Sequence, residues 1–270
     1  MKNKPHNKNV VVIVEGKSDL KAFEVVLPEL YECVDESYQV FFTRVLEDDI
    51  LKSGDITSKR GITPNNIEGL INKLLVGPVL ARQKIYARDI DEIIHLVDMD
   101  GAYIPDDCIT ECSPEFNGGK YFYGEDGISA PSVDDVRERN QRKRDNMDAL
   151  IGISEDVFHV HQNPENPRSK QSKVPYFVYY FSSNLDHFLQ GDPNLLDPRK
   201  KIAGGEKFAL EYGKDPEAAL NRLLNDPDAA GDLTYAESWE FIRQRNLNSI
   251  HRHTNIDLLI KRLQSMVDSQ

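Results

Sequence analysis

The sequence lacks the features that mark membrane-spanning and secreted proteins. Its three cysteines in 270 residues do not make a disulfide framework, and they fit a reducing compartment. No apolar run approaches the roughly 18 residues that cross a bilayer. The first residues also lack the apolar stretch of a signal peptide. We therefore expect a cytoplasmic protein with no membrane partner.

Basic charge is scarce as well. The chain has 33 Lys and Arg residues against 45 Asp and Glu residues, which gives a net charge of −12. Binding to a polyanion needs clustered Lys and Arg, so any such binding must depend on local patches or on metal ions. A phosphate-binding loop is absent too. Gly16-Lys17-Ser18 resembles the end of one, but Val11 stands where its leading glycine must be.

Short apolar runs alternate with amphipathic stretches along the first half of the chain. The pattern predicts helices at 19–30 and 64–80. It predicts strands at 10–14, 38–45, 93–97 and 175–181. This alternation predicts an α/β fold with a mostly parallel sheet flanked by helices. The uninterrupted run PYFVYYF at 175–181 predicts a central strand buried on both faces.

The rest of the chain departs from this alternation. Residues 101–135 are rich in Gly, Pro, Asp and aromatic residues without a sustained period, which predicts an irregular insertion. A charged helix is expected from Ser132 to about Leu150, then a short strand at 158–161 and an exposed loop at 163–173. Helices broken by prolines follow. We expect one domain at 1–185 and a helical C-terminal module at 186–270.

Acidic side chains follow two of the predicted strands. Glu15 comes after VVIV, and Asp98 and Asp100 come after IIHLV. The carboxyl ends of parallel strands meet at one edge of a sheet, so these three carboxylates should converge and repel one another. Binding of Mg²⁺ or Mn²⁺ would relieve the repulsion, and such ions can polarise a phosphodiester and activate water. The alternative is that the carboxylates cap helices and turns, which we favour for Asp19.

Two short motifs carry a family resemblance. VEGKSD at 14–19 and VDMDG at 97–101 resemble the glutamate motif and the Asp-x-Asp motif of TOPRIM domains. The resemblance implies a Rossmann-like TOPRIM domain, with Glu15 in acid/base chemistry or metal coordination and with Asp98 and Asp100 holding Mg²⁺. The chain is too short for a topoisomerase or a primase, and it is longer than the TOPRIM maturases of ribosomal RNA.

Among TOPRIM proteins, the chain most resembles the compact OLD-like nucleases of anti-phage, abortive-infection systems. That resemblance implies a metal-dependent endonuclease, acting as a toxic effector on host nucleic acid such as transfer RNA, with a separate ABC-type ATPase as its partner. It also makes Asp186 a candidate for a further metal ligand, although Asp186 could equally be the N-cap of the next helix. Such enzymes use a basic residue beside the second metal, and Lys207 is the candidate for that residue here.

Local basic clusters are the places where this acidic chain could hold nucleic acid. The candidates are Arg137, Arg142, Lys143 and Arg144, then Arg168, Lys170 and Lys173, and finally the run 199–201. The alternative for each cluster is a solvated face. The aromatic run 121–123 could stack on an unpaired base or belong to a core.

Other interpretations stay open at this point. Cys108, Cys112, His159 and His161 could bind zinc, or they could be buried thiols and ordinary imidazoles. The chain could be a non-catalytic TOPRIM module that binds nucleic acid or a partner, or a housekeeping RNA-processing nuclease. The sequence does not decide between a monomer and a homo-oligomer.

Overall fold

A four-stranded parallel sheet forms the centre of the molecule. The computed structural model describes residues 8–45, 55–166 and 168–269. The strands of this sheet stand in the order β2-β1-β3-β9, and their bounds are β1 (Lys8–Ile13), β2 (Tyr38–Thr43), β3 (Ile90–Asp98) and β9 (Tyr176–Phe181). The predicted α/β class with a parallel sheet is therefore confirmed.

The aromatic strand β9 lies at an edge of the sheet, so the prediction of a central strand was wrong. Its outer edge is covered by side chains instead of a further strand. The Tyr235 hydroxyl accepts a hydrogen bond from the Val178 amide and donates one to the Val178 carbonyl, each at 2.9 Å, and Asn255 Oδ1 accepts the Tyr180 amide at 2.7 Å. Because these contacts satisfy the exposed edge, an edge strand can be as apolar as a central one.

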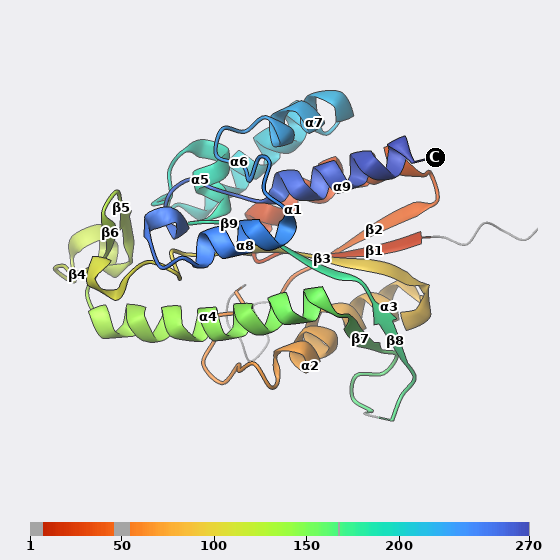
Figure 1. Cartoon of the computed structure of the whole chain (residues 1–270), viewed down its shortest axis with the longest axis horizontal. Coiled ribbons are helices and arrows are strands. Elements are labelled where there is room, and N and C mark those ends of the chain that lie inside the picture. The colour runs from red at the N-terminus through yellow and green to blue at the C-terminus, as the bar shows by residue number, and fades with distance from the viewer. Residues whose placement is uncertain (1–7, 46–54, 167, 270) are drawn as a thin grey trace, which may run out of the picture.

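Helices cover both faces of the sheet (Figure 1). One face carries α1 (Lys17–Val34), α5 (Leu185–Gln190), α6 (Pro198–Tyr212), α7 (Pro216–Leu224) and α9 (Ile256–Asp268). The other face carries α2 (Ile67–Ile71), a π-helical turn (Asn72–Val76), α3 (Gly77–Gln83), α4 (Val133–Glu155) and α8 (Tyr235–Arg243). Short 3₁₀ turns occur at Ala87–Asp89, Asp106–Cys108, Phe116–Gly119 and Leu247–Ser249.

The helices beyond residue 185 share the hydrophobic core of the sheet. Leu223 of α7 and Leu259 of α9 are buried in one cluster with Val10, Val12 and Phe23. The α4 helix begins after Ser132, as the sequence predicted, but it continues to Glu155, beyond the expected end near Leu150. The Ser132 hydroxyl accepts the Asp135 amide at 3.2 Å. The predicted helix at 64–80 is instead divided by the π-helical turn.

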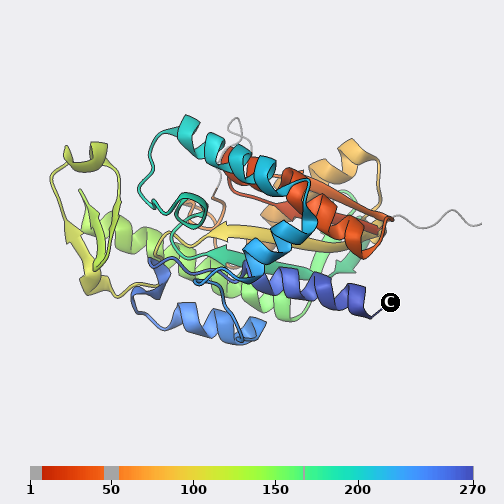
Figure 2. The same cartoon turned by 90° about the horizontal axis from the view of Figure 1, so that it is seen from above.

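Two small sheets stand at opposite ends of the molecule (Figures 1 and 2). The stretch predicted to be an irregular insertion contains a three-stranded sheet in the order β4-β6-β5, made of β4 (Ile109–Glu111), β5 (Phe122–Gly124) and β6 (Gly127–Ala130). At the other end, β7 (Phe158–His161) and β8 (Gln171–Val174) form an antiparallel pair. The predicted loop at 163–173 therefore ends in a strand.

The strand order defines a crevice at one edge of the main sheet. From β1 the chain passes through α1 to β2 on one side, and it then returns through α2 and α3 on the other face to place β3 on the opposite side of β1. The neighbouring strands β1 and β3 thus lead into helices on opposite faces, so the sheet opens beyond their carboxyl ends. Ligands of open α/β sheets bind at such a switch point.

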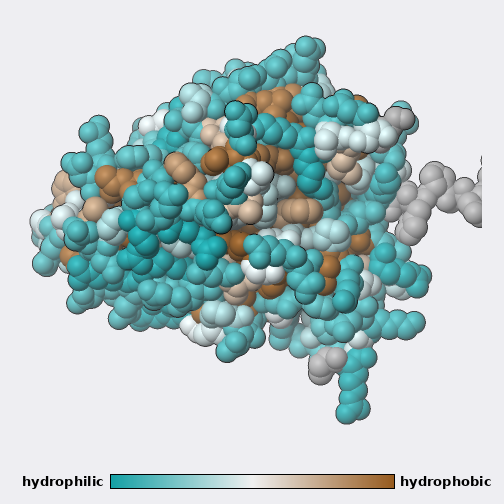
Figure 3. Space-filling model, in the orientation of Figure 1, coloured by the Kyte–Doolittle hydropathy of each residue, from teal (hydrophilic) through white to brown (hydrophobic). Residues whose placement is uncertain are grey.

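Polar side chains dominate one face of the molecule (Figure 3). Hydrophilic residues cover most of the face seen in Figure 3, with apolar residues in separate areas among them. No helix within the described ranges is long and apolar enough to cross a bilayer.

Helices α1 and α6 approach each other closely at a glycine. A Cβ atom at Gly205 would lie 2.4 Å from the backbone oxygen of Ser18, so only glycine fits without movement of one helix. This contact brings the start of α6, with Lys201, against the start of α1 and hence to the crevice.

We expect Gly205→Ala to lower the free energy of unfolding by about 1–2 kcal/mol, because overpacking outweighs the gain in helix propensity. Gly204→Ala is the matched control. The atoms nearest to a Cβ there belong to the far end of the flexible Gln190 side chain, which can move aside, so the effect should be neutral or slightly stabilising. Urea unfolding of both variants measures the difference, and equal stabilities would contradict the close approach.

Candidate functional site at the carboxyl end of the sheet

A cleft of about 600 Å³ opens at the switch point between β1 and β3. Its walls carry an unusual number of acidic side chains, namely Glu15, Asp19, Asp55, Asp98, Asp100 and Asp186. The structure therefore brings together the three carboxylates selected from the strand ends, and Asp186 joins them. These side chains come from stretches that are far apart in the sequence.

Backbone hydrogen bonds fix the predicted trio at the ends of two strands. Glu15 follows β1, and its Oε1 accepts the amide of Asp98 at 3.1 Å. Asp98 ends β3, and its Oδ1 accepts the amide of Leu185 at 2.9 Å. Asp100 has a φ of 52° and Gly101 a φ of 66°, so the chain turns sharply after β3. The Asp100 amide bonds the Ser183 carbonyl at 2.8 Å, which anchors this turn.

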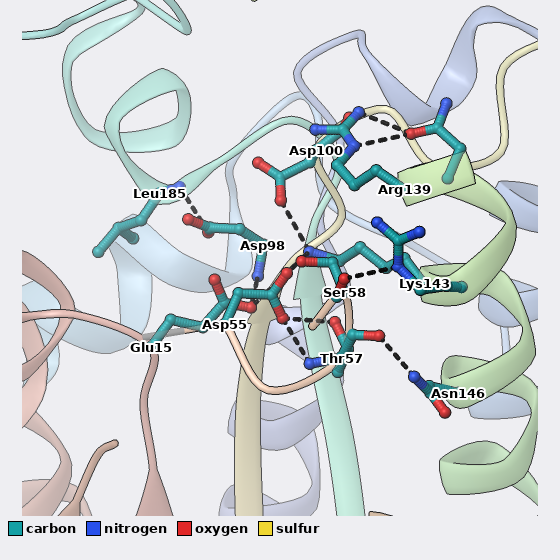
Figure 4. Close-up of polar contacts among 12 residues, drawn as sticks. Glu15, Asp55, Thr57, Ser58, Asp98, Asp100, Arg139, Lys143, Asn146 and Leu185 are labelled. Carbon is teal, nitrogen blue, oxygen red and sulfur yellow. Dashed lines mark hydrogen bonds and ion pairs between the residues drawn. The ribbon is translucent and has the colours of Figure 1, made fainter. Parts of the chain in front are cut away.

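A buried lysine stands among these carboxylates (Figure 4). The Lys143 side chain has 0% exposure, and its Nζ lies 2.8 Å from Asp100 Oδ2, 3.1 Å from Asp55 Oδ2 and 3.9 Å from Glu15 Oε1. The sequence suggested Lys143 as part of a basic patch for nucleic acid. Its place at the centre of the acidic cluster was not predicted.

Asp55 is the second residue of the site that sequence reasoning missed. Its Oδ1 accepts the amide and the hydroxyl of Thr57, at 2.7 and 2.6 Å, in a turn that presents Oδ2 to Lys143. Asp55 follows no apolar strand and belongs to no motif. The only available signal was the local pattern Asp-x-Thr-Ser, which is common in ordinary turns.

The cluster contains more negative charge than Lys143 compensates. Burial and the neighbouring Asp55 raise the pKa of Glu15 well above its usual range. Burial and the neighbouring Asp19 do the same to the pKa of Asp98. Burial alone would lower the pKa of Lys143, but Asp100, Asp55 and Glu15 outweigh it and raise that pKa. Burial also disfavours ionised Asp55, yet Lys143 and the Thr57 and Ser58 hydrogen bonds lower its pKa to about 2.

The other basic residues of α4 mainly hold loops in place. Arg139 Nη2 donates to the Asp100 carbonyl at 2.8 Å, and Arg144 Nη1 donates to the Ala102 carbonyl at 2.7 Å. Arg142 donates to the Ser58 carbonyl at 3.1 Å. Arg137 is exposed and donates to the Asp106 carbonyl. The predicted basic patch at 137–144 is thus largely turned toward the protein.

Two further acidic residues, Asp186 and Asp19, line the cleft. Asp186 lies in the first turn of α5, and its Oδ2 is 2.6 Å from Lys201 Nζ of α6. Asp186 does not cap that helix, because Asn184 does so by accepting the His187 amide. Asp19 accepts the Gly16 amide at 2.7 Å, which confirms its expected capping role. Lys207 does not line the cleft; it lies beside a separate hollow with Leu189 and Glu211.

The second basic cluster predicted to bind nucleic acid does not lie at the cleft. Arg168, Lys170 and Lys173 lie on the stretch that joins β7 and β8 or on β8 itself, near the end of the molecule remote from the small sheet β4-β6-β5 (Figures 1 and 2).

The proposed zinc ligands are separated in the same way. Cys108 and Cys112 flank β4, whereas His159 and His161 lie on β7, and these strands stand at opposite ends of the molecule. The four residues therefore make no common site. Within the described ranges, no three His, Cys, Asp or Glu side chains are already arranged as a metal cluster. In the cleft, Lys143 lies between the carboxylates.

Comparison with known proteins finds no relative, since no family model, curated protein or solved structure matches the chain. The interpretation of the cleft therefore depends on its own geometry and on the sequence motifs that line it.

We expect Lys143→Met to lower the free energy of unfolding at neutral pH, in the presence of EDTA, by about 3 kcal/mol, because it leaves buried carboxylates without their cation. In the parent, Lys143 is the first of the groups that lower the pKa of Asp55 to about 2, followed by the Ser58 and Thr57 hydrogen bonds. The contribution of Asp55 is present above pH 4 and is lost as the pH falls toward 2, so the difference between the variant and the parent should narrow in acid. Urea unfolding at several pH values measures this.

Lys170→Met is the matched control for that experiment. Lys170 is exposed, so its replacement should change stability by less than about 0.5 kcal/mol. Equal effects of the two substitutions would contradict the electrostatic role assigned to Lys143.

Proposed function

We propose that this chain is a metal-dependent endonuclease that hydrolyses phosphodiester bonds of nucleic acid, built on a TOPRIM domain. One observation carries the proposal. Glu15, Asp98 and Asp100 face an open cleft at the switch point of a parallel sheet, with a buried lysine among them. The two motifs that resemble TOPRIM signatures stand at the ends of β1 and β3, where that family's chemistry requires them.

The donors of the cleft suit a hard divalent cation by their chemistry, although the carboxylates would have to shift around Lys143 to bind one together. Its acidic groups offer only carboxylate oxygens, which are the ligands that Mg²⁺ and Mn²⁺ prefer. Burial and neighbouring carboxylates raise the pKa of Glu15 and of Asp98, and a bound cation would favour the ionised form of both groups. Glu15, Asp98 and Asp100 would hold the ion, and Asp186 could contribute on the α6 side. A bound ion would supply polarisation of the phosphodiester and a lower pKa for water.

The chain's own side chains suit the remaining tasks. Glu15 adjoins both candidate metal ligands at the end of β3, and burial raises the pKa of its carboxyl group, so it is the candidate acid/base group. The Lys143 ammonium holds Asp55 and Asp100 in place and puts a fixed positive charge beside the position where negative charge develops on phosphate. Lys143, and not Lys207, is thus the basic residue at the centre.

The wider role follows only from the resemblance to OLD-like nucleases. It supports a toxic effector of an anti-phage, abortive-infection system, which cuts host nucleic acid such as transfer RNA in the cytoplasm. An ABC-type ATPase would be its partner, and a basic surface of that partner would suit the net charge of −12. A housekeeping RNA-processing nuclease would share the chemistry of the cleft and differ in its substrate.

A non-catalytic TOPRIM module is the second candidate. The observation in its favour is that Lys143 already compensates part of the acidic charge, so the cluster can exist without a metal ion. In such a module the cleft would bind nucleic acid or a partner through its polar walls.

We expect Glu15→Gln and Asp98→Asn each to lower Mg²⁺- or Mn²⁺-dependent cleavage of nucleic acid by about 10²–10⁴-fold, because each removes a charged group from the reacting centre. Glu32→Gln, at an exposed position of α1, is the control and should cleave at the parent rate. Cleavage is followed on labelled RNA and DNA strands, with circular dichroism to confirm folding. Full activity in both cleft variants would rule the scheme out.

Calorimetric titration with Mn²⁺ separates the two candidate functions. We expect the intact chain to bind Mn²⁺ and Asp100→Asn to bind it more weakly, because one anionic ligand is lost. Asparagine tolerates the positive φ of this position, so the turn should be retained. An intact chain that binds no Mn²⁺ would favour the non-catalytic module.

A further inference from the structure

A second hollow of about 480 Å³ opens directly beside the cleft. It shares Asp98, Asp100 and Lys201 with the cleft, so a group placed in it adjoins the candidate reacting centre. Most of its other walls belong to two segments outside the main sheet, residues 120–123 at the start of β5 and the loop 193–196 that leads into α6, and Asn184 completes the lining. We call this hollow the side pocket.

Hydrogen bonds build the side pocket from both segments. The Tyr123 amide donates to Asn194 Oδ1 at 2.7 Å, and Asn194 Nδ2 donates to the Tyr123 carbonyl at 2.9 Å. This reciprocal pair joins residues 71 positions apart. The Tyr123 hydroxyl in turn donates to Asp100 Oδ1 at 3.2 Å. The small sheet, the loop and the candidate metal ligand are therefore held in one arrangement.

The side pocket differs from the cleft in chemistry. Tyr121 is half-buried, and the guanidinium carbon of Arg139 lies 4.8 Å from the centre of its ring. This cation–π contact holds the ring in position. The loop contributes Leu195 and Leu196, and Leu196 is 38% exposed despite its apolar side chain. Lys120 is exposed at the rim. Aromatic and aliphatic side chains therefore stand beside polar and charged groups such as Asn184, Asn194 and Lys201, and this combination suits a flat ring with apolar faces and a polar edge.

We infer that the side pocket holds an unpaired nucleobase next to the phosphodiester in the cleft, stacked on Tyr121. The inference rests on the proposed nuclease function and specifies its substrate class. A base inside a duplex is stacked and paired, so it cannot enter a side pocket without being extruded. Single strands and loops present such bases at little cost, and aromatic platforms bind them without strict sequence preference. The substrate is thus a single-stranded or looped nucleic acid.

The test compares a normal single strand with an abasic strand of the same length. Fluorescence anisotropy measures the binding of both to the intact chain, with Ca²⁺ in place of Mg²⁺ as a hard cation, and a gel confirms that the recovered strand is uncut. We expect the normal strand to bind about tenfold more tightly. Tyr121→Ala should abolish this preference and leave abasic binding unchanged, whereas Tyr121→Phe should keep it.

Tyr86→Ala is the matched control, since Tyr86 is an exposed tyrosine at the amino end of β3, away from the cleft. It should keep the full preference. The nucleobase inference would be overturned if the intact chain bound both strands equally, or if Tyr121→Ala kept the preference for the normal strand. The nuclease proposal would stand in either case. If neither strand binds and no strand is cleaved with Mg²⁺, both proposals fail together.

Discussion

The burial of one ammonium group among carboxylates is the constraint on which the carboxyl end of this sheet depends. Removing Lys143 from water costs several kcal/mol, and only close anionic partners offset such a cost. Asp55 and Asp100 lie within 3.1 Å of its Nζ, and Glu15 lies at 3.9 Å. These residues belong to three loops that are far apart in the sequence. A single charge on α4 thus fixes the relative positions of the strand ends and the Asp55 turn.

Most basic side chains of the same helix, α4, point into the protein and not into solvent. Arg139 and Arg144 donate to the carbonyls of residues 100 and 102, and Arg142 donates to that of Ser58. Asn146 continues the series with the Thr57 carbonyl. Helix α4 therefore holds two loops in place through hydrogen bonds to their carbonyls, the loop after β3 and the loop after Asp55. A polyanion in the cleft would contact Lys201, which lines it, and would lie near Lys143, which is buried beside Asp100.

The parts of this arrangement that the sequence predicted are those with a local signal. Glu15 and Asp98 each follow an apolar strand, and a parallel sheet brings such ends together whatever the details of packing. The contacts of Lys143 carry no such signal. A lysine in a charged helix is expected to be solvated, and only the fold places Asp55 and Asp100 beside it. The edge position of β9 was missed for a similar reason. Its outer hydrogen bonds go to Tyr235 and Asn255, which the chain supplies more than 50 residues later.

The charge imbalance distinguishes this cluster from a purely structural ion-pair network. A structural network gains most when its charges match, since every unpaired buried charge adds a desolvation cost. Here Glu15, Asp55, Asp98 and Asp100 share one buried ammonium, and burial raises the pKa of Glu15 and of Asp98. The excess charge can be neutralised by protons or by a divalent cation, and the two compete for the same oxygens. An open cleft at a switch point makes those oxygens accessible from solvent, so the unmatched charge lies where a cation and a phosphate can reach it.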